Sequence, residues 1–155
     1  MGPRDGQARL TLRTARFVLA LTLITASACN STTVAPSSLT ANWTGYVVYT
    51  VNGVTGSQNI SMMLTQVGPN ITGSYFATSQ GYFSLAQQPV RGTASLTFTG
   101  SLNFVTDTTV GCAGEIAVSG SPAGSELEWK GSTASSTCGS YVPTGVFIQL
   151  MRNTQ

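Results

Sequence analysis

The side chains able to do chemistry in this sequence are three cysteines and a few carboxylates, because the chain contains no histidine. Histidine is the commonest general base and the commonest zinc ligand, so both roles lose their usual residue. Glu126 and Glu128 alternate along a predicted strand, and we expect both to face solvent rather than flank a cleft as glycosidase carboxylates do. The sequence therefore predicts no enzyme activity, no metal site and no cofactor.

The residues before Cys29 have the layout of a secretory signal peptide. A basic stretch containing Arg4 and Arg16 precedes an apolar run over residues 17–26, and small residues follow. The apolar run is shorter than the roughly 20 residues of a membrane span, although an uncleaved anchor is the alternative. We expect residues 1–28 to be removed and the rest of the chain to be exported.

Export makes a disulfide possible for Cys112 and Cys138, the pair in the folded portion. We predict that they are bridged, and two free buried thiols are the alternative. Without residues 1–28, three basic side chains stand against four acidic ones. A nucleic-acid partner is not expected, because no basic patch remains.

Residues Thr25 to Cys29 resemble a bacterial lipobox, with Ala26 at the position that is most often leucine. The resemblance implies a diacylglyceryl group on the Cys29 thiol, cleavage before Cys29 and attachment to the membrane through acyl chains. The stretch 26–28 also suits ordinary signal peptidase, which would give a secreted or periplasmic protein with a free terminal thiol. We expect the lipid, and Asn30 after the cysteine favours the outer over the inner membrane of a bacterial envelope.

Two regions follow Cys29. Residues 29–41 are rich in Ser and Thr and lack periodicity, so we expect a lipidated cysteine and a flexible tether. Residues 42–155 show β patterning throughout, most clearly over 89–99, where Val90 to Phe98 alternate apolar and polar side chains. The expected strands are about 43–51, 57–67, 70–78, 81–86, 89–99, 102–106, 112–119, 126–132 and 145–152.

The short connections between these strands predict a meander. Asn52-Gly53 is a type I′ hairpin signal, and residues 68–70 and 100–101 indicate further turns. A meander of about eight antiparallel strands closes into a small up-and-down barrel and so removes its exposed edges. The fold class is therefore all-β, with a two-sheet β-sandwich as the alternative.

The domain resembles the small lipocalin/avidin-like barrels of bacterial lipoproteins. Trp43 and Gly45 match their Trp-x-Gly start, and Gly73 and Tyr75 match a Gly-x-Tyr strand. The resemblance implies a barrel that holds a small ligand. Biotin is not the expected ligand, because Gly45 occupies the place of a polar residue that helps to hold biotin in avidins.

Five aromatic residues are candidates for the lining of an internal pocket: Trp43, Tyr49, Tyr75, Phe98 and Trp129. Ordinary core packing is the competing interpretation, because aromatic residues dominate protein cores. The leading functional hypothesis is an envelope lipoprotein whose barrel binds a small apolar or amphipathic ligand. The alternative is a structural or interaction module with a filled core that meets another envelope protein or a glycan.

Overall fold

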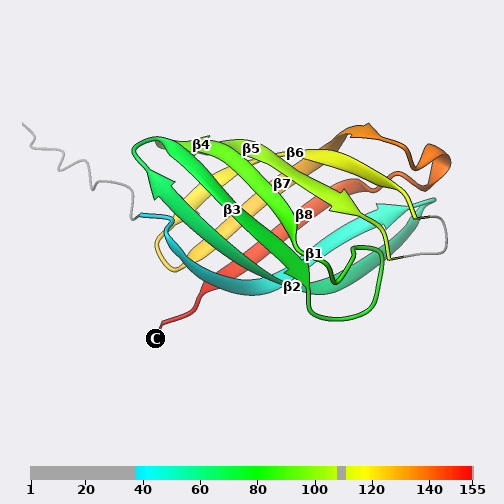
Figure 1. Ribbon diagram of the computed structural model, residues 1–155, viewed down its shortest axis with the longest axis horizontal. Coiled ribbons are helices and arrows are strands. Elements are labelled where there is room, and N and C mark those ends of the chain that lie inside the picture. The colour runs from blue at the N-terminus through cyan, green and yellow to red at the C-terminus, as the bar shows by residue number, and fades with distance from the viewer. Residues whose placement is uncertain (1–37, 108–110, 155) are drawn as a thin grey trace, which may run out of the picture. The chain divides into compact units, whose positions relative to one another are not determined.

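The computed structural model describes residues 38–107 and 111–154, which form a closed barrel of eight antiparallel strands (Figure 1). Each strand pairs with the next in the chain, and β1 pairs with β8 to close the ring. The strands are β1 (Ala41–Val51), β2 (Val54–Val67), β3 (Asn70–Ala77), β4 (Gln88–Ala94), β5 (Phe98–Val105), β6 (Ala113–Ala123), β7 (Glu126–Ser136) and β8 (Thr144–Arg152), with one 3-10 turn, η1 (Gly139–Tyr141), before β8. The predicted up-and-down barrel is confirmed, and the sandwich alternative is wrong.

The first hairpin has the predicted turn chemistry. Asn52 and Gly53 have φ angles of 50° and 78°, and the type I′ turn requires positive φ at both central positions. Asparagine and glycine are the residues that adopt this conformation at least cost. The turn leaves Val51 paired with Val54 at the start of the β1–β2 ladder.

One predicted strand, 89–99, is a hairpin instead. β4 ends at Ala94, β5 begins at Phe98, and these two residues pair across the turn. They lie four positions apart, so the period-2 alternation of the sequence passes through the turn without a break. Leu96, expected on the inner face, lies at the tip of the turn and is 83% exposed. The turn predicted at residues 100–101 is wrong for the same reason, since both residues lie within β5.

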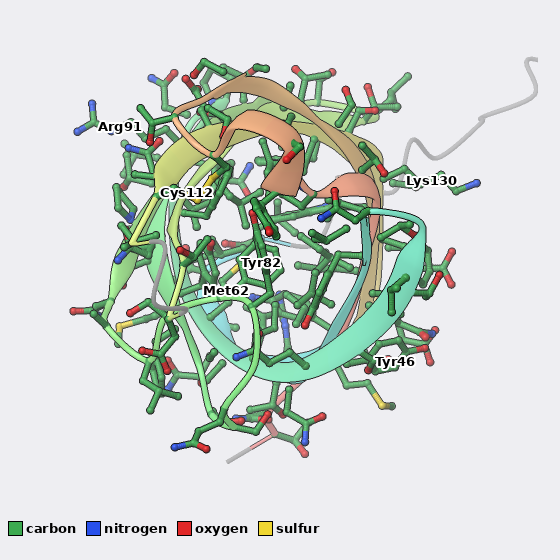
Figure 2. All side chains as sticks on the ribbon, turned by 90° about the vertical axis from the view of Figure 1, so that its right-hand side faces the viewer. Tyr46, Met62, Tyr82, Arg91, Cys112 and Lys130 are labelled. Carbon is green, nitrogen blue, oxygen red and sulfur yellow. A yellow bond between two sulfur atoms is a disulfide. The ribbon has the colours of Figure 1, made fainter. Side chains whose placement is uncertain are left out.

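The predicted strand 81–86 is also wrong. These residues belong to the loop 78–87 between β3 and β4, and their only strand-like pairing among the described residues is an isolated bridge from Phe83 to Thr106. The remaining alternation holds, because inward side chains of all eight strands form one apolar core. Figure 2 shows Met62 and Tyr82 inside the ring and Tyr46 and Arg91 pointing outward.

The two ends of the barrel differ in their connections (Figure 1). The end where the described chain starts at Ser38 and stops at Thr154 carries the short β2–β3, β4–β5 and β6–β7 turns, and we call it the terminal end. The opposite end carries the β1–β2 turn, loop 78–87 and η1. We call it the disulfide end, because Cys112 and Cys138 are bridged there.

Candidate functional site

The five predicted lining residues all point into the barrel. Trp43 and Tyr49 come from β1, Tyr75 from β3, Phe98 from β5 and Trp129 from β7. Their exposed fractions lie between 0% and 9%, because each occupies an inward position of its strand. They are therefore core residues.

These aromatic side chains do not form a single cage. Phe98 stacks on Trp129 with ring centroids 4.1 Å apart, and Tyr49 contacts Tyr82 at 5.4 Å near the disulfide end. Trp43 lies near the start of β1 at the terminal end, where the guanidinium of Arg152 faces its ring. The indole N–H of Trp129 is buried and has no hydrogen-bond partner within the described residues. A lone buried donor of this kind costs about 1–3 kcal/mol.

The stacked pair of aromatic rings depends on a glycine in the neighbouring strand. A Cβ at Gly92 would lie 2.6 Å from the ring of Phe98, closer than a side-chain carbon can approach. The absence of a side chain at this inward position leaves room for the Phe98 ring. The space left by Gly92 is thus occupied by the ring of Phe98.

An apolar void of about 10 Å³ lies inside the barrel. Tyr75 borders this void, and its hydroxyl donates a 2.9 Å hydrogen bond to the carbonyl of Asn103. Burial raises the pKa of Tyr75, so its phenol stays neutral. The void is lined by Val47, Ile60, Tyr75, Phe83, Leu102, Ile116, Val146 and Ile148. A cavity of about 10–15 Å³ holds one water molecule at most, so this void is too small for an organic ligand.

Loop 78–87 closes the disulfide end. Tyr82 and Phe83 turn inward and are 7% and 2% exposed. The side-chain amide of Gln58, 2% exposed, holds the loop through three hydrogen bonds. Its Nε2 donates to the carbonyls of Ser79 at 2.6 Å and Phe83 at 2.8 Å, and its Oε1 accepts from the Phe83 N–H at 2.8 Å.

Sequence reasoning missed this clamp. The available signal is the position of Gln58 in β2, where it shares the inward face with Ile60, Met62 and Leu64. A polar residue at an inward position must satisfy its hydrogen bonds inside the fold. The inward position of Gln58 therefore indicates that backbone groups of another segment lie close to its amide at the disulfide end.

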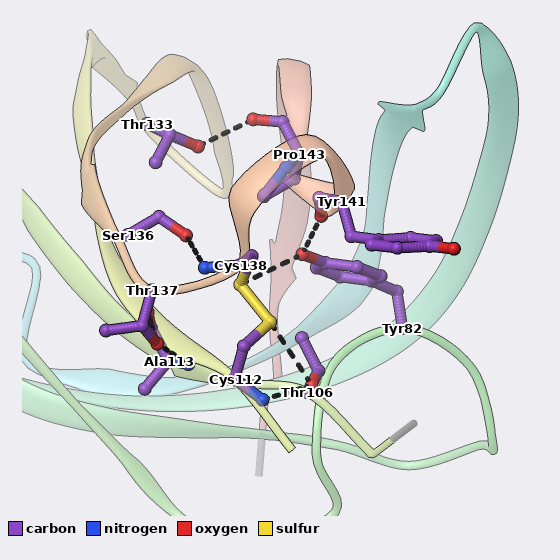
Figure 3. The surroundings of a disulfide bond; sticks show 10 residues. All are labelled: Tyr82, Thr106, Cys112, Ala113, Thr133, Ser136, Thr137, Cys138, Tyr141 and Pro143. Carbon is purple, nitrogen blue, oxygen red and sulfur yellow. Dashed lines mark hydrogen bonds between the residues drawn. A yellow bond between two sulfur atoms is a disulfide. The ribbon is translucent and has the colours of Figure 1, made fainter. Parts of the chain in front are cut away.

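Tyr82 connects the loop to the disulfide (Figure 3). Its hydroxyl donates a 2.5 Å hydrogen bond to the carbonyl of Tyr141 and lies 3.6 Å from Cys138 Sγ. Burial, together with the nearby phenol of Tyr49, raises the pKa of Tyr82 to about 12. The hydroxyl is thus a neutral donor at physiological pH, which suits a structural contact.

The predicted bridge between Cys112 and Cys138 is confirmed, with the two Cα atoms 5.0 Å apart. Thr106, directly after β5, makes two hydrogen bonds with Cys112, one of the two bridged cysteines. The Thr106 N–H donates to the Cys112 carbonyl at 2.8 Å, and the Cys112 N–H donates to Thr106 Oγ1 at 3.1 Å. The bond thereby links the start of β6 to the segment that leads into η1.

The chain's own first described residues close the terminal end. Leu39, assigned to the tether by sequence, is 1% exposed and packs with the core. Its N–H donates to Gln66 Oε1 at 2.8 Å, and its carbonyl accepts from Trp43 Nε1 at 3.1 Å. The guanidinium of Arg152 lies 5.0 Å from the Trp43 ring centroid and donates to the Ser38 carbonyl.

The carboxylates predicted to face solvent do so. Glu126 and Glu128 are exposed on the outer face of β7, where they border an open hollow together with Ser119 and Ser121 of β6. Within residues 38–107 and 111–154, no group of three or more His, Cys, Asp or Glu side chains is placed to hold a metal ion. No helix in this part of the chain is long and apolar enough to cross a membrane.

Cys29, the signal peptide over 1–28 and most of the tether lie outside the described residues, and they stay predictions. The barrel shares its architecture with lipocalin-like proteins. No protein-family model, no curated protein and no solved structure matches this chain. The fold and the interior described above are therefore the basis for a functional proposal.

Proposed function

We propose that this protein is an exported envelope lipoprotein, anchored through Cys29, whose barrel is a filled and rigid module that acts through its outer surface. The observation that carries the proposal is the tightly packed core, in which the void bordered by Tyr75 and Phe83 measures only about 10 Å³. Pockets for small organic ligands typically measure about 300–1,000 Å³. Of the two functions expected from the sequence, the filled interior favours the structural or interaction module.

Export is supported by the signal-like residues before Cys29 and by the Cys112–Cys138 bridge. Structural disulfides persist in oxidising compartments and are rare in the cytosol. Lipid on Cys29 explains the odd third cysteine, which the bridge leaves unpaired. The partner on the outer surface is then another envelope component, a protein or a glycan.

Mass spectrometry of the full-length protein purified from a bacterial envelope tests both parts of this proposal. The denatured mature chain is expected to begin at an acylated Cys29. The native mass is expected to equal the denatured mass. An unmodified terminal cysteine would contradict the anchor. A small molecule that is lost on denaturation would contradict the filled module and would favour ligand binding.

A second candidate function is uptake of a small apolar ligand when loop 78–87 opens. One observation favours it, because Phe83 belongs to this loop and also borders the internal void. Withdrawal of Phe83 would add the volume of its ring to the void. A Gln58→Ala variant that takes up an apolar fluorescent dye while staying folded would support this candidate. Dye uptake no greater than that of the unaltered protein would oppose it.

A further inference from the structure

The terminal end exposes apolar side chains at the tips of two neighbouring hairpins. Val67, at the end of β2, is 71% exposed, and Leu96, in the β4–β5 turn, is 83% exposed. The hairpins are joined by β3–β4 pairing and by a 2.8 Å hydrogen bond from the Ala94 N–H to the Pro69 carbonyl. The two tips therefore belong to one rigid surface.

The same end receives the chain from the expected anchor. The contacts of Leu39 and Arg152 hold the backbone around Ser38 against the barrel. Cys29 precedes Ser38 by nine positions in the sequence. A chain of this length spans at most about 30 Å, so a lipid on Cys29 would keep the terminal end near the bilayer.

We propose that the terminal end rests on the bilayer that holds the anchor, with Val67 and Leu96 inserted at the boundary between headgroups and acyl chains. This inference rests on the lipid attachment in the proposed function. Apolar side chains at this boundary bind by removal of apolar surface from water. Because the anchor makes the contact intramolecular, an effective concentration in the millimolar range allows a small surface to bind.

The charged side chains at the terminal end do not favour electrostatic binding to the bilayer. Arg152 and Glu126, one of each sign, lie at the end of β8 and the start of β7, and Arg152 is engaged with Trp43 and Ser38. A polybasic patch for anionic lipids would need several basic side chains together. We therefore expect the contact to be insensitive to salt.

The disulfide end provides a matched comparison. Val54, at the tip of the β1–β2 hairpin, is also a valine and is also 71% exposed, but it lies at the opposite end of β2 from Val67. Leu85 and Tyr141 are exposed at that end as well, at 48% each. Exposure alone thus does not distinguish the two ends, and the position of Ser38 does.

Tryptophan fluorescence in vesicles tests the proposal. The acylated full-length Val67→Trp and Val54→Trp variants are each reconstituted into vesicles of phosphatidylethanolamine and phosphatidylglycerol with brominated acyl chains. The native Trp43 and Trp129 are fully buried and present in both variants, so they contribute a common background. We expect about twofold stronger quenching for Val67→Trp than for Val54→Trp, unchanged at high salt, because an indole inserted at the boundary between headgroups and acyl chains lies close to the bromine atoms. A Leu96→Trp variant is expected to behave as Val67→Trp.

The possible failures are distinguishable. Equal quenching at the two valine positions, or none at either, in a preparation whose mass shows an acylated Cys29 would overturn the docking and leave the anchor standing. Stronger quenching at Val54 would place the disulfide end on the membrane and would also overturn it. An unacylated Cys29 in this preparation would overturn the anchor, and the docking with it.

Discussion

The two ends of this barrel are closed by different means. At the terminal end, Leu39 and Trp43 pack with the strand core, and the closing segment runs directly into β1. At the disulfide end, loop 78–87 is held by the amide of Gln58 and by contacts with the disulfide segment. Tyr82 and Phe83 also place their rings in this core, but among the described residues the loop has only one isolated bridge to the sheet. A segment with few ladder hydrogen bonds opens at a lower free energy than the strands beside it. We therefore expect the terminal end to unfold with the whole barrel and the disulfide end to open locally.

The largest effect is expected for Trp43→Ala. This side chain is fully buried, and its loss removes the partner of the Leu39 carbonyl and the surface beneath Arg152. Truncation of a buried tryptophan typically costs about 3–5 kcal/mol of unfolding free energy. Urea unfolding measures the loss, with the exposed Met63→Ala as a control expected to change little. A loss below about 1 kcal/mol would show that the terminal end is not part of the cooperative core.

The next largest effect is expected when Cys112 and Cys138 are both replaced by serine. The bridge joins residues separated by 26 positions, and closing a loop of this size contributes about 3.5 kcal/mol in the chain-entropy model. Amide hydrogen exchange should also become faster in loop 78–87, because the Tyr82 hydroxyl of this loop contacts Cys138 and the Tyr141 carbonyl. Unchanged hydrogen exchange in the loop would show that the disulfide does not help to hold loop 78–87 closed.

A matched pair of glutamines on β2 compares the two closures directly. Gln58→Leu leaves the Phe83 N–H and two loop carbonyls without their buried partner, and we expect a cost of about 2 kcal/mol. Gln66→Leu removes a part-buried hydrogen bond to the Leu39 N–H, with an expected cost of about 0.5–1 kcal/mol. Hydrogen exchange should quicken in loop 78–87 for the first variant and stay slow there for the second. A greater loss of stability for Gln66→Leu than for Gln58→Leu would show that the terminal end depends more on its polar contact than the disulfide end does.

The smallest effect concerns high pH. Because the pKa of Tyr82 is raised from 10.0 to about 12 in the folded protein, the unfolded chain loses its proton first. The stabilisation from neutral Tyr82 is therefore complete below pH 10 and is lost as the pH rises toward 12. Tyr82→Phe should unfold about 1 kcal/mol more easily at neutral pH, for want of its hydrogen bond to Tyr141, and lose less stability from pH 10 upward. Thermal unfolding across this pH range measures both changes, and identical slopes would contradict the raised pKa.

The sequence predicted the barrel because the alternation of apolar and polar residues specifies which face of each strand is buried. It did not predict the turn at Leu96, since the three-residue connection 95–97 places Phe98 four positions after Ala94 and so preserves the alternation. It assigned loop 78–87 partly to a strand, because Tyr82 and Phe83 have the composition of a buried strand. It identified five inward aromatic residues but not their separation, because the height of a side chain along the barrel axis depends on strand register, which composition does not show.

The pairing of β1 with β8 has a consequence for when the fold can form. β1 pairs with β2 on one side and with β8 on the other, where Trp43 lies opposite Arg152. Contacts between such distant parts of a chain slow folding, because the loop must close before the pairing stabilises it. A growing or translocating chain without its final strand has two open edges and an unsealed core. The barrel is therefore complete only when β8 is present, and a chain exported as proposed would still be open while it crosses the membrane.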